Sequence, residues 1–338
     1  MADQSKNDNH ITENDALFAS SRPSIHSSSS SNQQQPSTVR SRYQTPASEA
    51  TASSWNVQPG LGLMPDYSTS SDVPSILQGI DKNLLSYNMS HPKRGVAVIF
   101  NHEEFHLGTQ MPRRRGTQHD VDNLKKRLTK LQFDVKVHQD LTVVQLWDAL
   151  KNVSLQSHAD SDCFVCVFLT HGDNDVIYAY DGVLKLQELI DRFRGEKCKS
   201  LVGKPKIFLI QACRGEDHEI GIDAMDGLDD VELMDVDVAD AGPRPTVPAG
   251  ADFLLAYSVA EGYYSHRDTA YGSWFIQALS FVMERYGTTM EFTDMLLLVN
   301  HIVSQRSVKA CRDPAMIGKK QVPCFMSMLT KKLYFAKK

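Results

Sequence analysis

Residues 206–215 read Lys-Ile-Phe-Leu-Ile-Gln-Ala-Cys-Arg-Gly and decide the predicted fold. The first half of this stretch is almost entirely apolar, which is typical of a strand buried on both faces of a parallel sheet. Three further runs have the same character, namely 96–100, 163–169 and 253–257, and segments with helical spacing of apolar residues separate them. This alternation predicts a three-layer α/β sandwich, in which helices cover both faces of a mostly parallel six-stranded sheet.

The composition of the chain narrows its class. The 338 residues are 41% hydrophobic, which is enough for a substantial core, and the formal net charge of −5 gives no reason to expect nucleic acid as a partner. The polar, acidic N-terminus and the lack of a long apolar run lead us to expect no membrane partner. The six scattered cysteines suit reduced thiols. We therefore expect a cytoplasmic or also nuclear protein.

Two segments break the alternating pattern. Residues 1 to about 74 are rich in Ser, Asn, Gln, Pro and Thr, and such a segment is predicted to be disordered because it has too little apolar surface to bury. Residues 216–240 contain many acidic residues and no Lys or Arg, and several Gly and Pro residues follow them. This pattern predicts a mobile, self-repelling linker inside the folded domain.

Two chemically reactive side chains follow buried strands. Cys213 comes just after the strand 206–210, and His171 just after the run 163–169. Because the carboxyl ends of parallel strands meet at one edge of a sheet, we expect the thiol and the imidazole to lie together there. This pair can cleave amides, with the backbone N–H groups of Cys213 and Gly172 as candidate donors to an oxyanion. A cysteine at a strand end is, by itself, more often an apolar filler.

The wider sequence around Cys213 carries a family resemblance. Gln211-Ala212-Cys213-Arg214-Gly215, with His171 42 residues upstream, matches the caspase signature. Further matching runs are RRGT at 114–117, SHADSDCFVCVFLTHG at 157–172, LVGKPKIFLIQACRG at 201–215, AGADF at 249–253, YSVAEGYYSHRD at 257–268 and IGKKQVPCF at 317–325. The chain resembles the caspase family of cysteine proteases, within it the executioner group, and most of all its caspase-6 type.

The resemblance implies an activity and an assembly. It implies a caspase-like fold and a cysteine endopeptidase that cleaves proteins after aspartate, acts in apoptosis and needs no metal or organic cofactor. It also implies a zymogen that is activated by cleavage at aspartates. The apolar run that contains Met326, Met328 and Leu329 reads as a last strand, which in caspases lies at the subunit interface, so a homodimer is expected.

The resemblance also implies the residues that bind substrate. Arg114, Gln211 and Arg267 match positions that line the pocket for the substrate aspartate, and Ser265 lies beside them. Guanidinium groups suit this task because they pair with a carboxylate through two hydrogen bonds. Tyr264 and His266 match residues that border the neighbouring subsite. Several executioner caspases have tryptophan where this chain has His266, so their sequence preference does not transfer directly.

Three bonds between an aspartate and a small residue are candidate cleavage sites: Asp15-Ala16, Asp226-Gly227 and Asp240-Ala241. The first resembles the propeptide site of the caspase-6 type, and the other two fall at its intersubunit linker. The predicted organisation is a propeptide (1–15), a disordered extension (16–85), a large subunit (86–226), an acidic linker (227–240) and a small subunit (241–338). An acidic linker also contains such pairs by chance.

Parts of the sequence also fit other interpretations. A catalytically silent caspase-like scaffold would not need Cys213, His171 and the two arginines. A Rossmann-type nucleotide binder would need a glycine-rich turn after the first strand, where the chain instead reads Asn-His-Glu-Glu at 101–104.

The spacing of Cys163 and Cys166 suggests a metal or redox pair, but residues three apart in a strand face opposite sides. An N-terminus at Ala241 would resemble the peptides bound by inhibitor-of-apoptosis proteins, although a Pro-rich linker explains the same residues.

Overall fold

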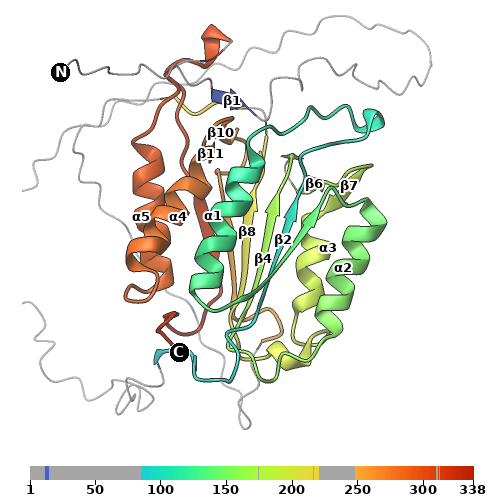
Figure 1. Cartoon of the computed structure of the whole chain (residues 1–338), viewed down its shortest axis with the longest axis vertical. Coiled ribbons are helices and arrows are strands. Elements are labelled where there is room, and N and C mark those ends of the chain that lie inside the picture. Colours follow the sequence, from blue (N-terminus) through green and yellow to red (C-terminus); the bar gives the residue numbers. More distant parts are fainter. Residues whose placement is uncertain are drawn as a thin grey trace, which may run out of the picture. The chain divides into compact units, whose positions relative to one another are not determined.

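The computed structural model describes residues 12–14 (backbone only), 85–173, 175–215, 217–220, 248–309, 311 and 313–338. Its centre is a six-stranded sheet in the order β12-β9-β8-β4-β2-β3 (Figure 1). Every neighbouring pair is parallel except β9 and β12. The mostly parallel sheet predicted from the sequence is therefore confirmed. The strands are β2 (Val96–Asn101), β3 (Asp134–Gln139), β4 (Phe164–Leu169), β8 (Lys206–Gln211), β9 (Phe253–Tyr257) and β12 (Cys324–Ser327).

Helices cover both faces of this sheet (Figure 1). The helices α1 (Thr117–Lys130), α4 (Trp274–Tyr286) and α5 (Phe292–Ser304) lie on one face, and α2 (Val143–Leu155) and α3 (Leu186–Ile190) lie on the other. Short 3-10 helices cover Leu107–Thr109, Asp191–Phe193, Lys199–Leu201 and Pro314–Met316. The three-layer sandwich predicted from the alternation of strand and helix patterns is confirmed.

The central strands are apolar throughout because each of them serves two cores. In β2, Ala97 and Ile99 belong to the core under α1, α4 and α5, whereas Val98 and Phe100 belong to the core under α2 and α3. Successive side chains of a strand point to opposite faces, so a sheet covered on both sides needs an apolar residue at every position. Cys163 and Cys166 divide in the same way between the two cores. Their predicted role as core residues is confirmed.

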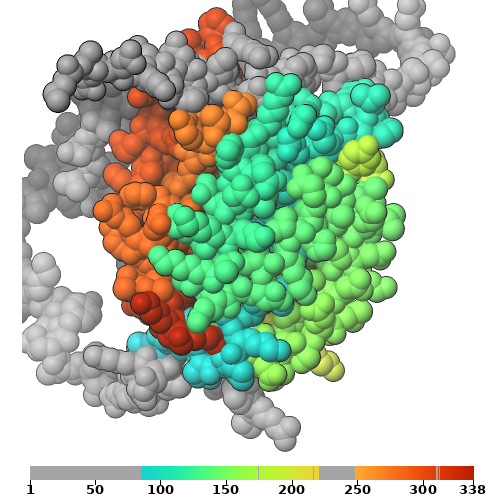
Figure 2. Space-filling view, in the orientation of Figure 1, coloured from blue at the N-terminus to red at the C-terminus, as the bar shows by residue number. Residues whose placement is uncertain are grey.

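The parts of the chain before and after residues 221–247 share one sheet and one core. Strand β8 pairs in parallel with β9, and Lys206 lies opposite Phe253. Arg127 of α1, which is buried, donates to both carboxylate oxygens of the partly exposed Glu284 in α4, at 2.7 and 2.8 Å. Figure 2 shows the two parts in direct contact along this seam, the earlier in green and the later in orange. A cut between them would leave this shared core in place.

Two small sheets flank the main one. One contains β5 (Gly172–Asp173), β6 (Val176–Tyr178) and β7 (Val183–Lys185), and the other has the order β1-β10-β11. The members of the second are β1 (Thr12–Asn14), β10 (His266–Asp268) and β11 (Gly272–Ser273). Strand β1 contradicts the expectation that residues 1 to about 74 are disordered throughout. Strand pairing uses backbone groups, so composition does not reveal it. Apart from Leu85, the predicted disordered extension lies outside the described residues, as does the acidic linker.

Within the part of the chain that the structure describes, no helix has the length and apolar character needed to cross a bilayer. The same residues contain no cluster of three or more His, Cys, Asp or Glu side chains arranged to hold a metal ion.

Candidate active site

Cys213 and His171 lie just past the ends of two neighbouring parallel strands. Strand β4 pairs with β8, and Leu169 is opposite Gln211 at the last position of the ladder. The pairing extends one step further, because the Thr170 N–H donates to the Gln211 carbonyl at 3.1 Å. Each reactive residue follows its strand by two positions, so the shared register brings both to the same edge of the sheet.

Gly172 lets the two chain segments meet closely. A Cβ atom at this position would lie 2.8 Å from the Ala212 Cβ atom and 2.8 Å from the Cys213 carbonyl oxygen. Contacts below 3.0 Å are essentially never found for a real Cβ atom. Glycine is therefore required for the backbone that follows His171 to pack directly against the backbone of Cys213.

The His171 imidazole is held in one orientation by a backbone carbonyl. Its Nε2 atom lies 2.8 Å from the Pro112 oxygen, and its ring packs on Phe105 at a centroid distance of 4.9 Å. A carbonyl can only accept, so Nε2 carries the proton and Nδ1 of the neutral ring is left as the base. Burial, assisted by the charge of Arg114, lowers the pKa of His171 to about 3. The imidazole is neutral at pH 7.

The Cys213 thiol is also neutral in this structure. It is buried, and burial raises its pKa to about 11. The Ser265 N–H, which donates to Cys213 Sγ at 3.5 Å, and the charge of Arg114 both oppose this shift, but burial outweighs them. The site therefore pairs a protonated thiol with an unprotonated imidazole, which is the arrangement that can pass a proton from sulfur to nitrogen.

Arg114 is a completely buried cation next to the thiol. Its Nη1 atom donates to the His102 carbonyl at 3.1 Å and to the Thr117 hydroxyl at 3.0 Å. Burial lowers the pKa of Arg114 to about 10, while Asp120 is the strongest charge that favours its protonated form. The guanidinium remains charged at pH 7. A buried cation of this kind offers an anion a partner without competing water.

The other predicted pocket residues surround the same point. Gln211 donates through Nε2 to the Ser265 hydroxyl at 2.7 Å, and Ser265 in turn contacts Cys213 Sγ. Arg267 donates through Nε to the carbonyl of Arg115, the residue after Arg114, at 2.9 Å. The structure thus brings Arg114, Gln211, Ser265 and Arg267 together around Cys213.

Tyr264 and His266 flank this cluster. The Tyr264 ring stacks on His218 at 4.2 Å between centroids, and the His266 ring packs on Trp274 at 4.8 Å. The His266 N–H donates to Gln321 Oε1 at 2.7 Å, and burial lowers the pKa of this histidine to about 4. His266 is therefore a neutral, packed side chain at pH 7.

Comparison with known proteins identifies the family of this site. The Caspase domain model matches residues 94–334. Caspase-6 of Mus musculus is 54% identical over 254 residues, which cover 75% of this chain and 92% of that protein. Caspase-6 of Gallus gallus is 50% identical over 254 residues (74% and 83%), and caspase-3 of Felis catus is 43% identical over 250 residues (74% and 87%). The chain belongs to the caspase family. It is an aspartate-specific cysteine protease of the kind that acts in apoptosis, and the resemblance to the caspase-6 type is confirmed.

Sequence reasoning missed one residue that supports the caspase pocket. The Thr117 hydroxyl accepts a hydrogen bond from Arg114 and donates one to Asn101 Oδ1 at 2.6 Å. It therefore ties the guanidinium to the end of β2. Thr117 ends the matching run at 114–117, but a threonine after a glycine also resembles an ordinary helix start, so the run alone did not single it out.

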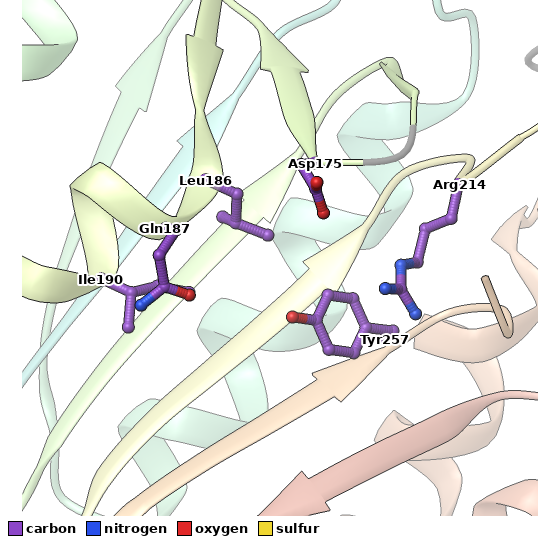
Figure 3. Close-up of a pocket in the computed structure, with 6 residues that line it drawn as sticks. All are labelled: Asp175, Leu186, Gln187, Ile190, Arg214 and Tyr257. Atoms are coloured by element: carbon purple, nitrogen blue, oxygen red, sulfur yellow. The ribbon is translucent and has the colours of Figure 1, made fainter. Parts of the chain in front are cut away.

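Arg214, the residue after the nucleophile, extends to a separate small cavity of about 50 Å³ (Figure 3). Its guanidinium lies 4.2 Å from the centroid of the Tyr257 ring and pairs with Glu261 at 3.2 Å. In Figure 3 Arg214 lies next to the Tyr257 ring, with Asp175 across the cavity. These contacts anchor the chain directly after Cys213. The predicted cleavage residues Asp15, Asp226 and Asp240 lie outside the described residues.

The raised pKa of Cys213 predicts how its reactivity depends on pH. Below pH 11 the thiolate is the minor form, so alkylation of Cys213 in the uncut protein should accelerate about tenfold per pH unit between pH 7 and 9. Iodoacetamide labelling followed by mass spectrometry of the Cys213 peptide measures this rate, and the partly exposed Cys311 provides an internal control. A rate at Cys213 that is already independent of pH above 7 would contradict the buried, protonated thiol.

Proposed function

We propose that this caspase is an executioner protease, made as an inactive precursor, that cleaves cytoplasmic and nuclear proteins after aspartate in apoptosis. The observation that supports the proposal is the register of β4 and β8, which brings the residues that carry a thiol and an imidazole to the same edge of the sheet, in a chain that also holds two buried arginines. A catalytically silent scaffold would need none of these four groups. The absence of a required cofactor remains part of the proposal.

The proposed mechanism assigns one step to each group. Cys213 Sγ attacks the carbonyl carbon of the substrate bond while its proton passes to His171 Nδ1. The imidazolium then protonates the leaving amine as the C–N bond breaks, and a thioester remains on Cys213. Water, deprotonated by His171, attacks the thioester, and His171 returns the proton to Cys213 Sγ as the C–S bond breaks and the acid is released. The backbone N–H groups of Gly172 and Cys213 are the proposed donors to the oxyanion in both steps.

Selectivity for aspartate is assigned to the arginine pocket. A carboxylate that leaves water needs fixed, charge-assisted partners, and Arg114 and Arg267 are two buried cations, of which Arg114 interacts with the charge of Cys213 and Arg267 is bonded to the residue after Arg114. Gln211 and Ser265, already joined by a hydrogen bond, complete the proposed pocket. Tyr264 and His266 border the next subsite. An uncharged amide leaves the two cations without an anion, so asparagine at the cleaved bond should be rejected.

A panel of fluorogenic tetrapeptides tests this assignment. Processed enzyme should cleave the peptide ending in Asp at least about a hundredfold faster, in kcat/KM, than matched peptides ending in Asn or Glu. The Cys213→Ala variant provides the control for contaminating proteases. Equal turnover of the Asp and Asn peptides would contradict the pocket, and no turnover of any peptide would favour the scaffold interpretation.

Activation is proposed to proceed by cleavage at Asp226 and Asp240, which removes the acidic linker. The resulting large subunit (86–226) and small subunit (241–338) would stay associated, because β8 and β9 are paired and α1 packs on α4. A new N-terminus at Ala241 is the proposed, weaker basis for binding an inhibitor-of-apoptosis protein.

The pairing of β1 with β10 supports cleavage at Asp15. The strands are antiparallel, with Thr12 opposite Asp268, Glu13 opposite Arg267 and Asn14 opposite His266. Ser265, the residue before His266 in the chain, donates its N–H to Cys213 Sγ at 3.5 Å. The last residue of β1 therefore pairs with the neighbour of a residue that is bonded to the nucleophile. We propose that the Asp15-Ala16 bond is cut within the same molecule.

Cleavage within one molecule predicts first-order kinetics. The rate constant for cutting at Asp15 should stay constant over a hundredfold dilution of the uncut protein, whereas cleavage between molecules would slow in proportion. Time courses by mass spectrometry measure it, with Asp8→Ala as the matched control and Asp15→Ala and Cys213→Ala as blocked variants. A rate that falls in proportion to protein concentration would contradict cleavage within one molecule.

The homodimer is assigned to strand β12. This strand is an edge of the six-stranded sheet, and Met326 on it is 57% exposed. Beside it lies a cavity of about 170 Å³, with Met326, Met328, Phe253 and Tyr257 among its lining residues. An exposed apolar edge strand favours pairing with another chain, and a second copy of β12 would cover it.

Substitution on this edge tests the dimer. Met326→Glu should weaken dimerisation by about tenfold or more, because a charge would enter the proposed interface. Sedimentation equilibrium measures the association constant, and Leu297→Glu on α5, where the side chain is also 57% exposed, is the matched control. Equal association of both variants and the unmodified protein would exclude β12 as the interface.

A further inference from the structure

Asp120 of α1 is a buried carboxylate that forms hydrogen bonds with β11, a strand next to the site. It lies in the first turn of α1 and is completely buried. Oδ1 accepts a hydrogen bond from the Ser273 N–H at 2.8 Å, and Oδ2 accepts one from the Ser273 hydroxyl at 2.6 Å. Both oxygens are therefore used on a single residue of β11, which fixes its position relative to α1.

Ser273, the residue that Asp120 binds, lies directly opposite the pocket arginine Arg267. In the pairing of β10 with β11, Ser273 is the partner of Arg267, and Gly272 is the partner of Asp268. A Cβ atom at Gly272 would lie 2.4 Å from Asp120 Oδ1, so a residue without a side chain is needed for the carboxylate to reach this strand. The hydrogen bonds of Asp120 thus act on the strand pair that carries Arg267.

The segment that leads into α1 carries the other pocket arginine, Arg114, and also contacts this hairpin. A Cβ atom at Gly116 would lie 2.8 Å from the Asp268 carbonyl oxygen and 2.7 Å from the Thr269 carbonyl oxygen, so the two backbones are in direct contact. Arg267 donates to the Arg115 carbonyl across the same contact. Asp120 is one turn further along the helix. It holds together the two segments from which Arg114 and Arg267 arise.

The electrostatics of Asp120 favour a role in this assembly. Burial of a carboxylate is costly, and it raises the pKa of Asp120 to about 6, while the Ser273 hydrogen bonds and the charge of Arg114 oppose that shift. The same pair of charges favours the protonated form of Arg114. A buried anion that is hydrogen-bonded at both oxygens and complements a buried cation is a rigid arrangement.

We propose that Asp120 is a positioning residue for the aspartate pocket, which sets the distance between Arg114 and Arg267 by fixing β11 to α1. The inference rests on the proposed assignment of both arginines to the substrate carboxylate. Asp120 touches neither the thiol nor the imidazole, so its loss should weaken binding of the substrate aspartate and leave the chemistry at Cys213 intact.

Three substitutions in the processed enzyme separate the contributions. Asp120→Ala removes both hydrogen bonds and should raise KM for the Asp peptide by about tenfold to a hundredfold, with kcat within about threefold of the unmodified enzyme. Asp120→Asn keeps both contacts, because its amide N–H₂ can donate to the Ser273 oxygen, and should change KM by less than about threefold. Ser273→Ala removes one bond and should give an intermediate KM.

Asp122→Ala is the matched control, since Asp122 lies on the same helix, is exposed and bonds only Gln118 among the described residues. The rate of iodoacetamide labelling of Cys213 should be the same in all variants.

A KM for Asp120→Ala equal to that of Asp122→Ala would overturn the proposal. A fall in kcat of Asp120→Ala as large as its rise in KM, together with a changed labelling rate of Cys213, would indicate general disruption and would also overturn the proposal. An Asp120→Asn variant with a KM as high as that of Asp120→Ala would assign the effect to charge, which is a third outcome that overturns it. Should Asp120→Ala not fold, Ser273→Ala decides, and an unchanged KM overturns the proposal. If the unmodified enzyme does not prefer Asp over Asn peptides, the pocket itself is wrong, which is a separate outcome.

Discussion

The parallel pairing of β4 with β8 is the constraint on which the site depends. Leu169 lies opposite Gln211, and the chain leaves both strands at the same edge, so His171 and Cys213 emerge together. A register shift of one residue would turn each side chain of a strand to the other face of the sheet. Both strands are buried on both faces, and their partition between two cores fixes that register. The packing of the whole domain therefore determines the geometry of two side chains.

The same burial that fixes the geometry also sets the protonation states. Loss of water raises the pKa of Cys213 and lowers that of His171, so the neutral pair is favoured in the closed site. The charge of Arg114 lowers the pKa of both groups, because a nearby cation favours the thiolate of Cys213 and disfavours the imidazolium of His171. Attack on a substrate needs the proton to leave sulfur. Burial of both groups therefore favours the neutral thiol and imidazole over the thiolate and imidazolium.

The sequence predicted the central strands because their apolar runs have no other simple explanation, and it predicted α1, α2 and α4 from helical spacing. It did not predict β3, which has exposed and half-buried residues at the sheet edge, or β1, a three-residue strand in a polar segment. Cys213 and His171 were found because motifs mark them. Asp120 lies in none of the matching runs, because its importance arises from contacts with Ser273, which becomes its neighbour only in the folded chain. Thr117 lies in the run at 114–117, but only the structure shows that its hydroxyl joins Arg114 to Asn101.

Strand β10 has two edges with different roles. Its edge toward β11 is held from α1 by two hydrogen bonds to a buried carboxylate, and a glycine permits that contact. Its edge toward β1 is paired in antiparallel register with three residues of the N-terminal segment, Thr12–Asn14. The order β1-β10-β11 thus places Arg267 on a central strand whose position is set from α1 through β11, while its other edge pairs with a segment more than 250 residues away in the sequence.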